Sequence, residues 1–451
     1  MAPALSKFVG QTLGCQLDVH NCYELAHTWH PDCNTAALLL GKDALKFSVR
    51  TYATLYLLAT LLRWRGLKNV NFLRLARDVG RSSAFLSLNA ILFLYFICVF
   101  RRAFGFWSLP VVGLYNGVAA SFCAILVEQK KRRPLLALYM ANLASEVMFR
   151  QLCNRNVLKP LPYGEVLLFS LSLAGYFRLL RKGGLDEGVA KVLRLIFAST
   201  DQDVLPVESL PRFAADFVRR SRKLTSSKHR LCSHSQSCIS HSSEAFARNF
   251  LIAFTLSSGL KVLTSLKRFL RRPSSAPAAL LGRKALSLPL MVGLLPATYQ
   301  GCLCVLRRIF DRDTPAMHAA AGALAGLPMC FYPSVTIAMY ALWKLIEIYY
   351  FKGVTAGRLP SWKYGDVLLY SLSTGYVIFA NCVEPHAVRS GYRNFLGSLS
   401  GGKLWQVNRF LIDVFGTDSS RWIREKHFVI PTLNPLYTTE NPAIMPTGPV
   451  G

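Results

Sequence analysis

The chain has 451 residues, of which 52% are hydrophobic, and its mean hydropathy is +0.29. A soluble chain of this length would form two or three domains, whereas this apolar composition favours a polytopic membrane protein. The net charge of +29 comes from 53 Lys and Arg against 24 Asp and Glu. These cations stand in short clusters at the ends of apolar runs, as at Arg101–Arg102 and Arg307–Arg308. That placement indicates contact with a bilayer that carries anionic headgroups, and it argues against nucleic-acid binding.

The first half of the chain begins with a polar head, residues 1–43, that is rich in Cys and His. The head has neither the apolar core of a secretory signal nor the Arg-rich pattern of a presequence. A first membrane-helix repeat is expected over 44–182, and each of its apolar runs is near the length that crosses about 30 Å of hydrocarbon. An amphipathic stretch at about 44–63 precedes the predicted spans, at about 84–100, 109–127, 134–149 and 166–180.

The second half follows a polar, basic connector, residues 183–245, which has the composition of a flexible, solvated junction. A second membrane-helix repeat is expected over 246–384. The remaining segment, 385–451, is predicted to be a tail that becomes disordered beyond Tyr437. The predicted spans of the second half are about 286–305, 316–331, 334–351 and 366–383.

An internal repeat relates the two halves. Residues 163–172 match 364–373 almost letter for letter, and the matched numbers differ by 201 from Tyr139 and Tyr340 onward. Such repeats indicate a duplicated folding unit, and in apolar chains they are typical of transporters and translocases with a site near the repeat interface. We therefore predict an all-α polytopic membrane protein made of two tandem repeats of about four membrane helices each, with Cys/His-rich head segments.

Paired glycines occur at corresponding places in the two halves. Gly113 and Gly117 are four residues apart in one predicted span, and Gly322 and Gly326 are four apart in the matching span. Small residues at this spacing let two helix backbones approach closely inside a membrane. We predict that these glycines are helix-packing positions.

Two acidic residues fall inside apolar runs at equivalent positions of the repeat. Glu146 and Glu347 are each costly to bury in a membrane, so they are expected to face water or partners. One interpretation is a polar pathway between the repeats. The other is a pair of buried ion pairs, because Arg150 follows Glu146 by four residues and Lys344 precedes Glu347 by three.

Cys and His residues gather ahead of each apolar half and form a candidate metal or redox cluster. Metal binding, a redox-sensitive thiol pair and simple packing at the interface all remain open, because the Cys spacings exceed the two to four residues common in zinc sites. Four other cysteines within apolar runs, Cys98, Cys123, Cys302 and Cys304, are interpreted as small packing residues. The candidate cluster residues are His20, Cys22, His27, His30, Cys33, Cys232, His234 and Cys238.

No enzymatic constellation stands out in the sequence. The chain lacks a Gly-rich phosphate loop, a Gly-x-Ser-x-Gly elbow and a His-Glu-x-x-His motif. Ser170 and Ser172, and their counterparts Ser371 and Ser373, lie inside predicted helices and are expected to bond their own backbone. The protein is therefore predicted not to be an enzyme, and no cofactor is predicted.

The head motif His20-Asn21-Cys22-Tyr23-Glu24-Leu25-Ala26-His27-Thr28-Trp29-His30-Pro31-Asp32-Cys33 closely resembles the N-terminal cysteine-rich motif of the transmembrane protein 135 family, also called peroxisomal membrane protein 52. The resemblance continues over nearly the whole chain. Its further matches are at 139–144, 164–169, 350–353, 413–417 and 437–439.

The resemblance implies a similarity to the mitochondrial inner-membrane translocase superfamily, whose unit is a four-helix membrane bundle. It implies a non-enzymatic protein of peroxisomal and/or mitochondrial membranes that regulates mitochondrial fission, peroxisome function and lipid metabolism. Fission or lipid-transfer proteins are its expected partners, beside the lipid bilayer itself. The alternative is a lipid or metabolite carrier with a polar path between the two repeats.

Overall fold

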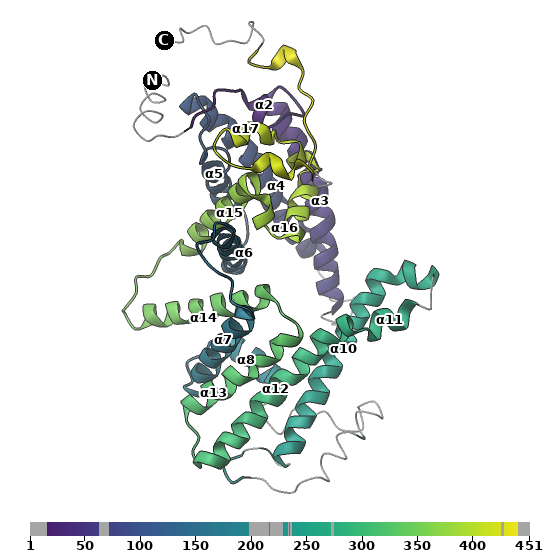
Figure 1. Cartoon of the computed structure of the whole chain (residues 1–451), viewed down its shortest axis with the longest axis vertical. Coiled ribbons are helices and arrows are strands. Elements are labelled where there is room, and N and C mark those ends of the chain that lie inside the picture. The colour runs from purple at the N-terminus through teal and green to yellow at the C-terminus, as the bar shows by residue number, and fades with distance from the viewer. Residues whose placement is uncertain are drawn as a thin grey trace. The chain divides into compact units, whose positions relative to one another are not determined.

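The described chain is built from helices (Figure 1). Within the described residues, β structure is limited to one antiparallel bridge between Asp18 and Trp107. The fold is therefore all-α, as expected from the sequence. The computed structural model describes residues 16–62, 72–197, 216, 229–232, 234, 237–271, 275–424 and 428–440.

The helices divide into two compact units that do not coincide with the two halves of the sequence. Unit 1 comprises Met1–Lys159 and Trp362–Gly451, and unit 2 comprises Pro160–Ser361. The chain therefore enters unit 2 after the third membrane-type helix of the first half and returns to unit 1 before the last helix of the second half.

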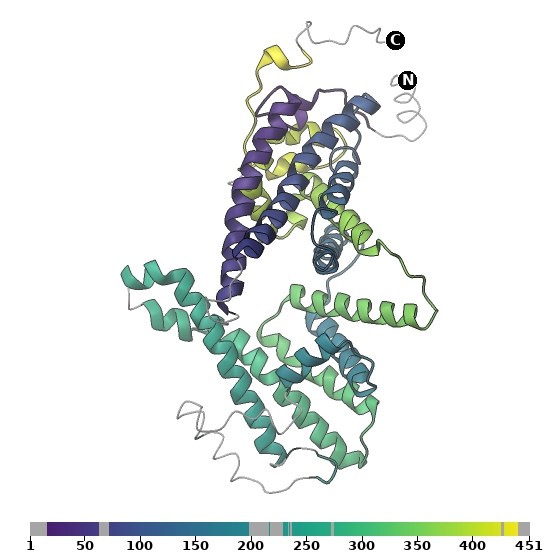
Figure 2. The ribbon, with the colours of Figure 1, turned by 180° about the vertical axis from the view of Figure 1, so that it is seen from behind.

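Unit 1 is centred on a pair of long helices, α3 and α4, which pack along each other (Figure 2). Helix α15 packs against α5 and α6, and the core that they share includes Val147, Val377 and Ala380, together with Phe85 from α4. The helices of unit 1 are α2 (Cys22–Leu25), α3 (Cys33–Leu62), α4 (Phe72–Phe104), α5 (Leu114–Ile125), α6 (Arg133–Asn154), α15 (Gly365–Val383), α16 (Ser390–Leu399) and α17 (Arg409–Asp413), with short 3-10 helices η5 (Pro385–Ala387), η6 (Lys403–Gln406), η7 (Ser419–Arg424) and η8 (Pro435–Tyr437).

Unit 2 contains a second pair of long helices, α10 and α12, packed along each other. Helix α7 packs against α13 and α14, and Phe177 stacks on Tyr299 at a ring separation of 3.8 Å in the core. The helices of unit 2 are α7 (Gly164–Arg181), α8 (Glu187–Phe197), α10 (Cys238–Arg271), α11 (Ser275–Leu281), α12 (Arg283–Phe310), α13 (Pro315–Ala325) and α14 (Val335–Thr355), with the 3-10 helix η4 (Leu327–Phe331).

Each unit contains one helix that the sequence repeat would assign to the other unit. The division predicted from the repeat groups α7 with residues 44–182 and α15 with residues 246–384, but α7 packs in unit 2 and α15 packs in unit 1. The two helices begin with the near-identical segments 163–172 and 364–373. Because they present nearly the same side chains, either helix has a surface that suits either bundle. The tandem-repeat architecture stays a prediction.

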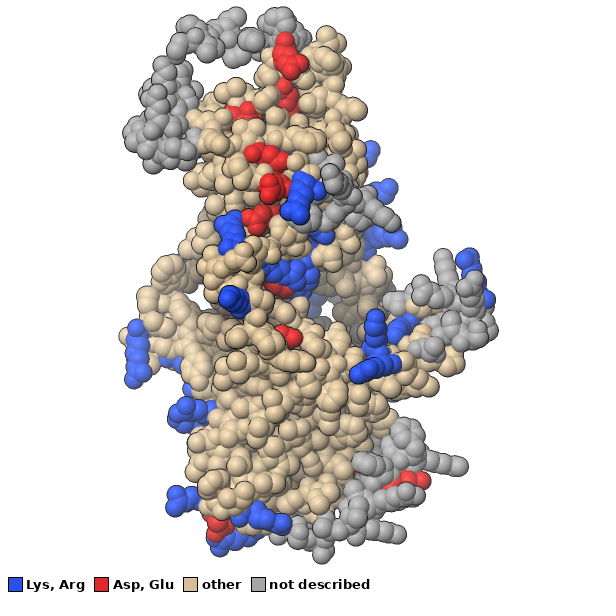
Figure 3. Space-filling model, viewed as in Figure 1, with Lys and Arg blue, Asp and Glu red and all other residues tan. Residues whose placement is uncertain are grey.

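Three helices are long and apolar enough to cross a membrane, within the described residues: Phe72–Phe104, Ala279–Phe310 and Gly365–Val383. The shorter α5 is also apolar. The other predicted spans, at 134–149, 166–180, 316–331 and 334–351, are largely helical, but none qualifies as a span by length and hydropathy. Figure 3 shows a broad uncharged surface over unit 2 on the face drawn, with Lys and Arg toward its margins. Together with the apolar helices, this surface supports an integral membrane protein.

The predicted connector, 183–245, is partly helical. Residues Glu187–Phe197 form α8, and α10 begins at Cys238. Except for Asp216, residues 198–228 lie outside the described residues. Disorder is predicted beyond Tyr437, but residues 438–440 are described and Thr439 is hydrogen-bonded to Glu24; the residues beyond Glu440 lie outside the described residues.

Candidate functional sites

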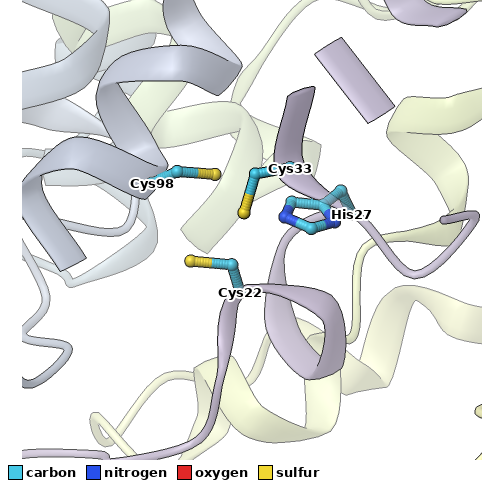
Figure 4. Close-up of side chains that lie close together, drawn as sticks. All are labelled: Cys22, His27, Cys33 and Cys98. Atoms are coloured by element: carbon cyan, nitrogen blue, oxygen red, sulfur yellow. The ribbon is translucent and has the colours of Figure 1, made fainter. Parts of the chain in front are cut away.

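Four side chains of unit 1 converge on one point (Figure 4). They are Cys22 in α2, His27 just after α2, Cys33 at the first position of α3, and Cys98 near the end of α4. One ligand atom from each lies within 4.8 Å of all the others, and three of the four residues are buried. Because α3 and α4 pack along each other, the start of one helix lies beside the end of the other.

The ring of His27 has a fixed orientation in this cluster. Its Nδ1 atom lies 2.8 Å from the carbonyl oxygen of His30, so the nitrogen donates its proton there. Its Nε2 atom is buried and has no hydrogen-bond partner within the described residues. Metal-bound histidines usually show this pattern, in which one ring nitrogen donates to a carbonyl and the other carries the free lone pair.

The close packing of these groups changes their protonation. Contacts with the sulfurs of Cys22 and Cys98 and with His27 lower the pKa of the Cys33 thiol. Burial lowers the pKa of His27, but the thiol groups of Cys22 and Cys33 outweigh this and raise its pKa to about 10. The sulfurs therefore favour a positive charge within the cluster.

The head segment is held in place by contacts from distant parts of unit 1. Asn21 and Glu24 form a capping box at the start of α2, and Glu24 also accepts hydrogen bonds from the backbone and hydroxyl of Thr439, each at 2.9 Å. The carbonyl of His20 accepts hydrogen bonds from Arg101 and from the Trp107 ring. Residues of the head motif outside the four-member cluster therefore hold the head segment against the rest of unit 1.

A second cluster of the same composition lies in unit 2. It contains Cys232, His234, Cys238 and Cys304, whose ligand atoms again lie within 4.8 Å of one another. The Cys232 sulfur is 3.9 Å from that of Cys238 and 3.7 Å from that of Cys304, and the Cys304 sulfur is 3.4 Å from His234 Nε2. Cys238 is the first residue of α10, and Cys304 lies near the end of α12.

The structure changes the membership of both clusters. His20 instead contacts the carboxylate of Asp18 at 2.5 Å, and His30 accepts a hydrogen bond from the backbone of Asp32. Cys98 and Cys304 are buried, as a packing role implies, and each also supplies the fourth member of a cluster, which the packing interpretation did not include. A repeated motif could have revealed them, since Cys98-Val-Phe-Arg-Arg102 and Cys304-Val-Leu-Arg-Arg308 each end an apolar run.

The cysteine-rich region is also what relates this chain to known proteins. Residues 19–153 match the N-terminal cysteine-rich region of Transmembrane protein 135. Over this segment, which is less than half of the chain, the protein is similar to the transmembrane protein 135 family. The matched segment includes all four members of the first cluster, Cys98 among them. No solved structure matches the chain.

Unit 1 also contains an apolar pocket of about 120 Å³. One face of α4 forms a wall, through residues spaced three or four apart from Leu86 to Ile97. Helices α3, α15 and α16 supply the other walls, with Leu40, Ile378 and Leu399 among the lining residues. Such an apolar lining favours a ligand with an apolar body.

Two asparagines in the wall of the pocket differ in their hydrogen bonding. Asn89 donates to the hydroxyls of Ser121 and Tyr370, at 3.3 and 3.4 Å. Asn381 is fully buried, and neither atom of its side-chain amide has a hydrogen-bond partner within the described residues. A buried amide without partners costs free energy, so Asn381 is available for the polar group of a ligand.

The four paired glycines all lie where another helix backbone approaches. A Cβ atom on Gly113 or Gly117 would lie 2.9 Å from a backbone Cα atom of α15. A Cβ atom on Gly322 would lie 2.9 Å from the carbonyl oxygen of Leu173 in α7, and one on Gly326 would lie 2.5 Å from Ser170 Cα. The glycines of each sequence half therefore contact the helix that comes from the other half.

The two acidic residues of the repeat have different surroundings. Glu146 is buried and forms ion pairs with Arg150, at 2.6 Å, and with Arg389. Glu347 is partly exposed and pairs with Lys344 at 2.5 Å. Both carboxylates are thus engaged in ion pairs within their own units, and their equivalent sequence positions do not give them equivalent roles.

This difference predicts unequal effects of neutralising the two acids. Glu146→Gln is expected to lower the free energy of unfolding by about 1–3 kcal/mol, because it leaves two arginines without their shared anion. Glu347→Gln, the matched control, should change it by less than about 1 kcal/mol, as partly exposed pairs contribute little. Thermal unfolding of the purified variants in detergent measures both. Equal effects would contradict the different burial of the two sites.

Proposed function

We propose that this chain is a non-enzymatic protein of peroxisomal or mitochondrial membranes that binds a lipid in the pocket of unit 1. By the family resemblance, lipid occupancy would regulate mitochondrial fission, peroxisome function and lipid metabolism, through partners such as fission or lipid-transfer proteins. The observation that carries the proposal is the apolar pocket with the unpartnered amide of Asn381 in its wall. The ligand is a lipid with one hydrogen-bonding group, such as a fatty acid or a sterol.

The position of the pocket supports a lipid ligand over a water-soluble one. Its walls include α4 and α15, two of the three helices that are long and apolar enough to span a membrane. A lipid in the surrounding bilayer therefore lies near these walls already. Because apolar surface dominates the lining, the affinity would come mainly from burying the lipid body, and Asn381 would select the polar group.

The test is photo-crosslinking of the full-length protein with a diazirine-bearing fatty acid or sterol. The label is expected on peptides of α4, α15 and α16. Ala90→Phe, which fills the pocket from α4, should abolish that labelling. Ala103→Phe on the exposed side of the same helix is the control and should leave it intact. Labelling that is insensitive to Ala90→Phe would contradict binding in this pocket.

Exchanging either asparagine for leucine separates ligand binding from stability. Asn381→Leu should weaken lipid binding about tenfold, yet stabilise the lipid-free protein by about 1–3 kcal/mol, because an unpaired buried amide disappears. Asn89→Leu is the matched comparison and should destabilise the protein, because Ser121 and Tyr370 lose their donor. Thermal unfolding with and without lipid measures both effects. If Asn381→Leu destabilises the lipid-free protein, the amide has a structural partner.

The same variants address the alternative, a lipid or metabolite carrier. Protein in liposomes that moves labelled lipid between leaflets, and loses that activity in Ala90→Phe, would support a carrier. Binding without movement would support the regulatory role. Rescue of mitochondrial shape in cells that lack the protein then tests whether occupancy matters, since Ala90→Phe should fail and Ala103→Phe should succeed.

A further inference from the structure

We propose that each unit binds one zinc ion through three thiolates and one imidazole. In unit 1 the ligands are Cys22, His27, Cys33 and Cys98, and in unit 2 they are Cys232, His234, Cys238 and Cys304. Three cysteines and one histidine are a common ligand set of structural zinc, and four protein ligands leave no open position for a substrate. The role that follows is structural rather than catalytic.

The distances in unit 2 agree with a tetrahedral zinc site. Zinc–sulfur bonds of about 2.3 Å and zinc–nitrogen bonds of about 2.0 Å imply sulfur–sulfur separations of about 3.8 Å and sulfur–nitrogen separations of about 3.5 Å. The sulfur of Cys232 lies 3.9 and 3.7 Å from its two sulfur neighbours, and the sulfur–nitrogen distance is 3.4 Å. A disulfide needs a separation of about 2.05 Å and would join only two of the three sulfurs.

The orientation of His27 gives independent support in unit 1. Its Nδ1 atom is held by the His30 carbonyl, and its buried Nε2 atom lacks a partner and lies among the three sulfurs. A histidine that merely packed in an apolar core would pair both nitrogens or expose one. An ion at the centre of the cluster would satisfy Nε2 and the thiolates together.

The same construction appears in both units. The third ligand, Cys33 or Cys238, is the first residue of a long helix, where the helix dipole stabilises a thiolate. The fourth ligand, Cys98 or Cys304, lies near the end of a long helix that packs along it. Each ion would therefore tie the start of one helix to the end of the other and fix the polar segment that precedes them.

Metal analysis of the full-length protein, purified in detergent without chelator, tests the proposal. We expect two zinc ions per chain by mass spectrometry of the metal content. Cys98→Ser and Cys304→Ser should each remove one ion, and the double variant should remove both. The matched controls are Cys302→Ser, two residues before Cys304 on the same helix, and Cys123→Ser on α5, and both should retain two ions. Metal-free wild-type protein, or metal loss from the controls alone, would overturn the proposal.

Two further measurements hold even where a serine variant fails to fold. His27→Cys keeps a four-ligand set and should retain the ion, whereas His27→Phe should lose it although it preserves a ring in the same space. Wild-type protein loaded with Co²⁺ should show the thiolate charge-transfer absorption of a tetrahedral site. A Cys232–Cys238 disulfide in the purified protein, found by peptide mass spectrometry, would replace the zinc assignment in unit 2.

Discussion

Replacing Gly326 by alanine is expected to destabilise the protein by about 2–3 kcal/mol, because it forces helix α13 away from α7. The new methyl group would lie 2.5 Å from Ser170 Cα and 2.4 Å from Ser170 Oγ. The serine hydroxyl can rotate away, but the Cα atom belongs to the α7 backbone and cannot move alone. The backbone that blocks the methyl group therefore belongs to α7, the helix that unit 2 takes from the first half of the sequence.

Two other glycines provide controls with the opposite expected sign. Around Gly80 in α4 and Gly259 in α10, no atom lies within 4 Å of an added Cβ. Gly80→Ala and Gly259→Ala should be neutral or stabilise by up to about 1 kcal/mol, because alanine favours a helix over the unfolded chain. Thermal unfolding in detergent, followed by the fraction of protein that stays monodisperse, compares the three variants. Equal midpoints would mean that the α7–α13 contact does not limit stability.

The glycine pairs illustrate how far the sequence alone leads. Their spacing and their recurrence indicate close helix contacts, and the structure places Gly117 and Gly326 against helix backbones. The sequence does not reveal the partner helix, because the segments that open α7 and α15 are nearly identical. Pairing of either helix with α5 or α13 would satisfy the same pattern of small and apolar residues. Only the packing of the whole unit therefore determines which helix is the partner of each glycine pair.

The metal-type clusters show a second limit. Cys22, His27 and Cys33 stand close together in the sequence, and composition alone draws attention to them. Cys98 is 65 residues beyond Cys33 in the numbering and lies in an apolar run, where a packing role is the simpler interpretation. Its contribution depends on α3 and α4 packing along each other, which residue spacing does not encode. The shared Cys-Val-x-Arg-Arg motif indicates the fourth cluster member only when the two clusters are compared.

Equivalent positions in a repeat also need not share a role. Glu146 and Glu347 match in the sequence, yet Glu146 acquires a second cationic partner, Arg389, from the segment that follows α15. Within the described residues, the ion pair of Glu347 is the one with its helix neighbour Lys344. The difference arises from residues beyond the aligned part of the repeat, so the alignment could not predict it.

Arg409 has no distinguishing pattern in the sequence, but its replacement by methionine should have the largest effect, a loss of about 3–5 kcal/mol. Its side chain is 2% exposed. The guanidinium donates to the carbonyl of Cys382 at 3.0 Å and to the hydroxyl of Ser419 at 2.8 Å, and it lies 4.1 Å from the centre of the Phe428 ring.

These contacts place a cation at the C-terminal end of α15, where unpaired helix carbonyls carry partial negative charge. Methionine fills a similar space but removes the donor to the Asn381 carbonyl and to the Ser419 hydroxyl, and it leaves the Cys382 carbonyl with the Ser419 hydroxyl as its donor. Arg409→Lys should fall between the two, because an ammonium keeps the charge but cannot reproduce the spread of donors.

Arg421→Met is the matched control, since Arg421 is exposed and lies in the same C-terminal segment, and it should change stability by less than about 0.5 kcal/mol. Thermal unfolding of the four proteins in one detergent gives the order of stability directly. Because α15 also forms a wall of the pocket, Arg409→Met should weaken lipid labelling along with stability, whereas Arg409→Lys should preserve labelling at low temperature. A stable Arg409→Met protein would mean that the buried cation is dispensable and that other groups satisfy the end of α15.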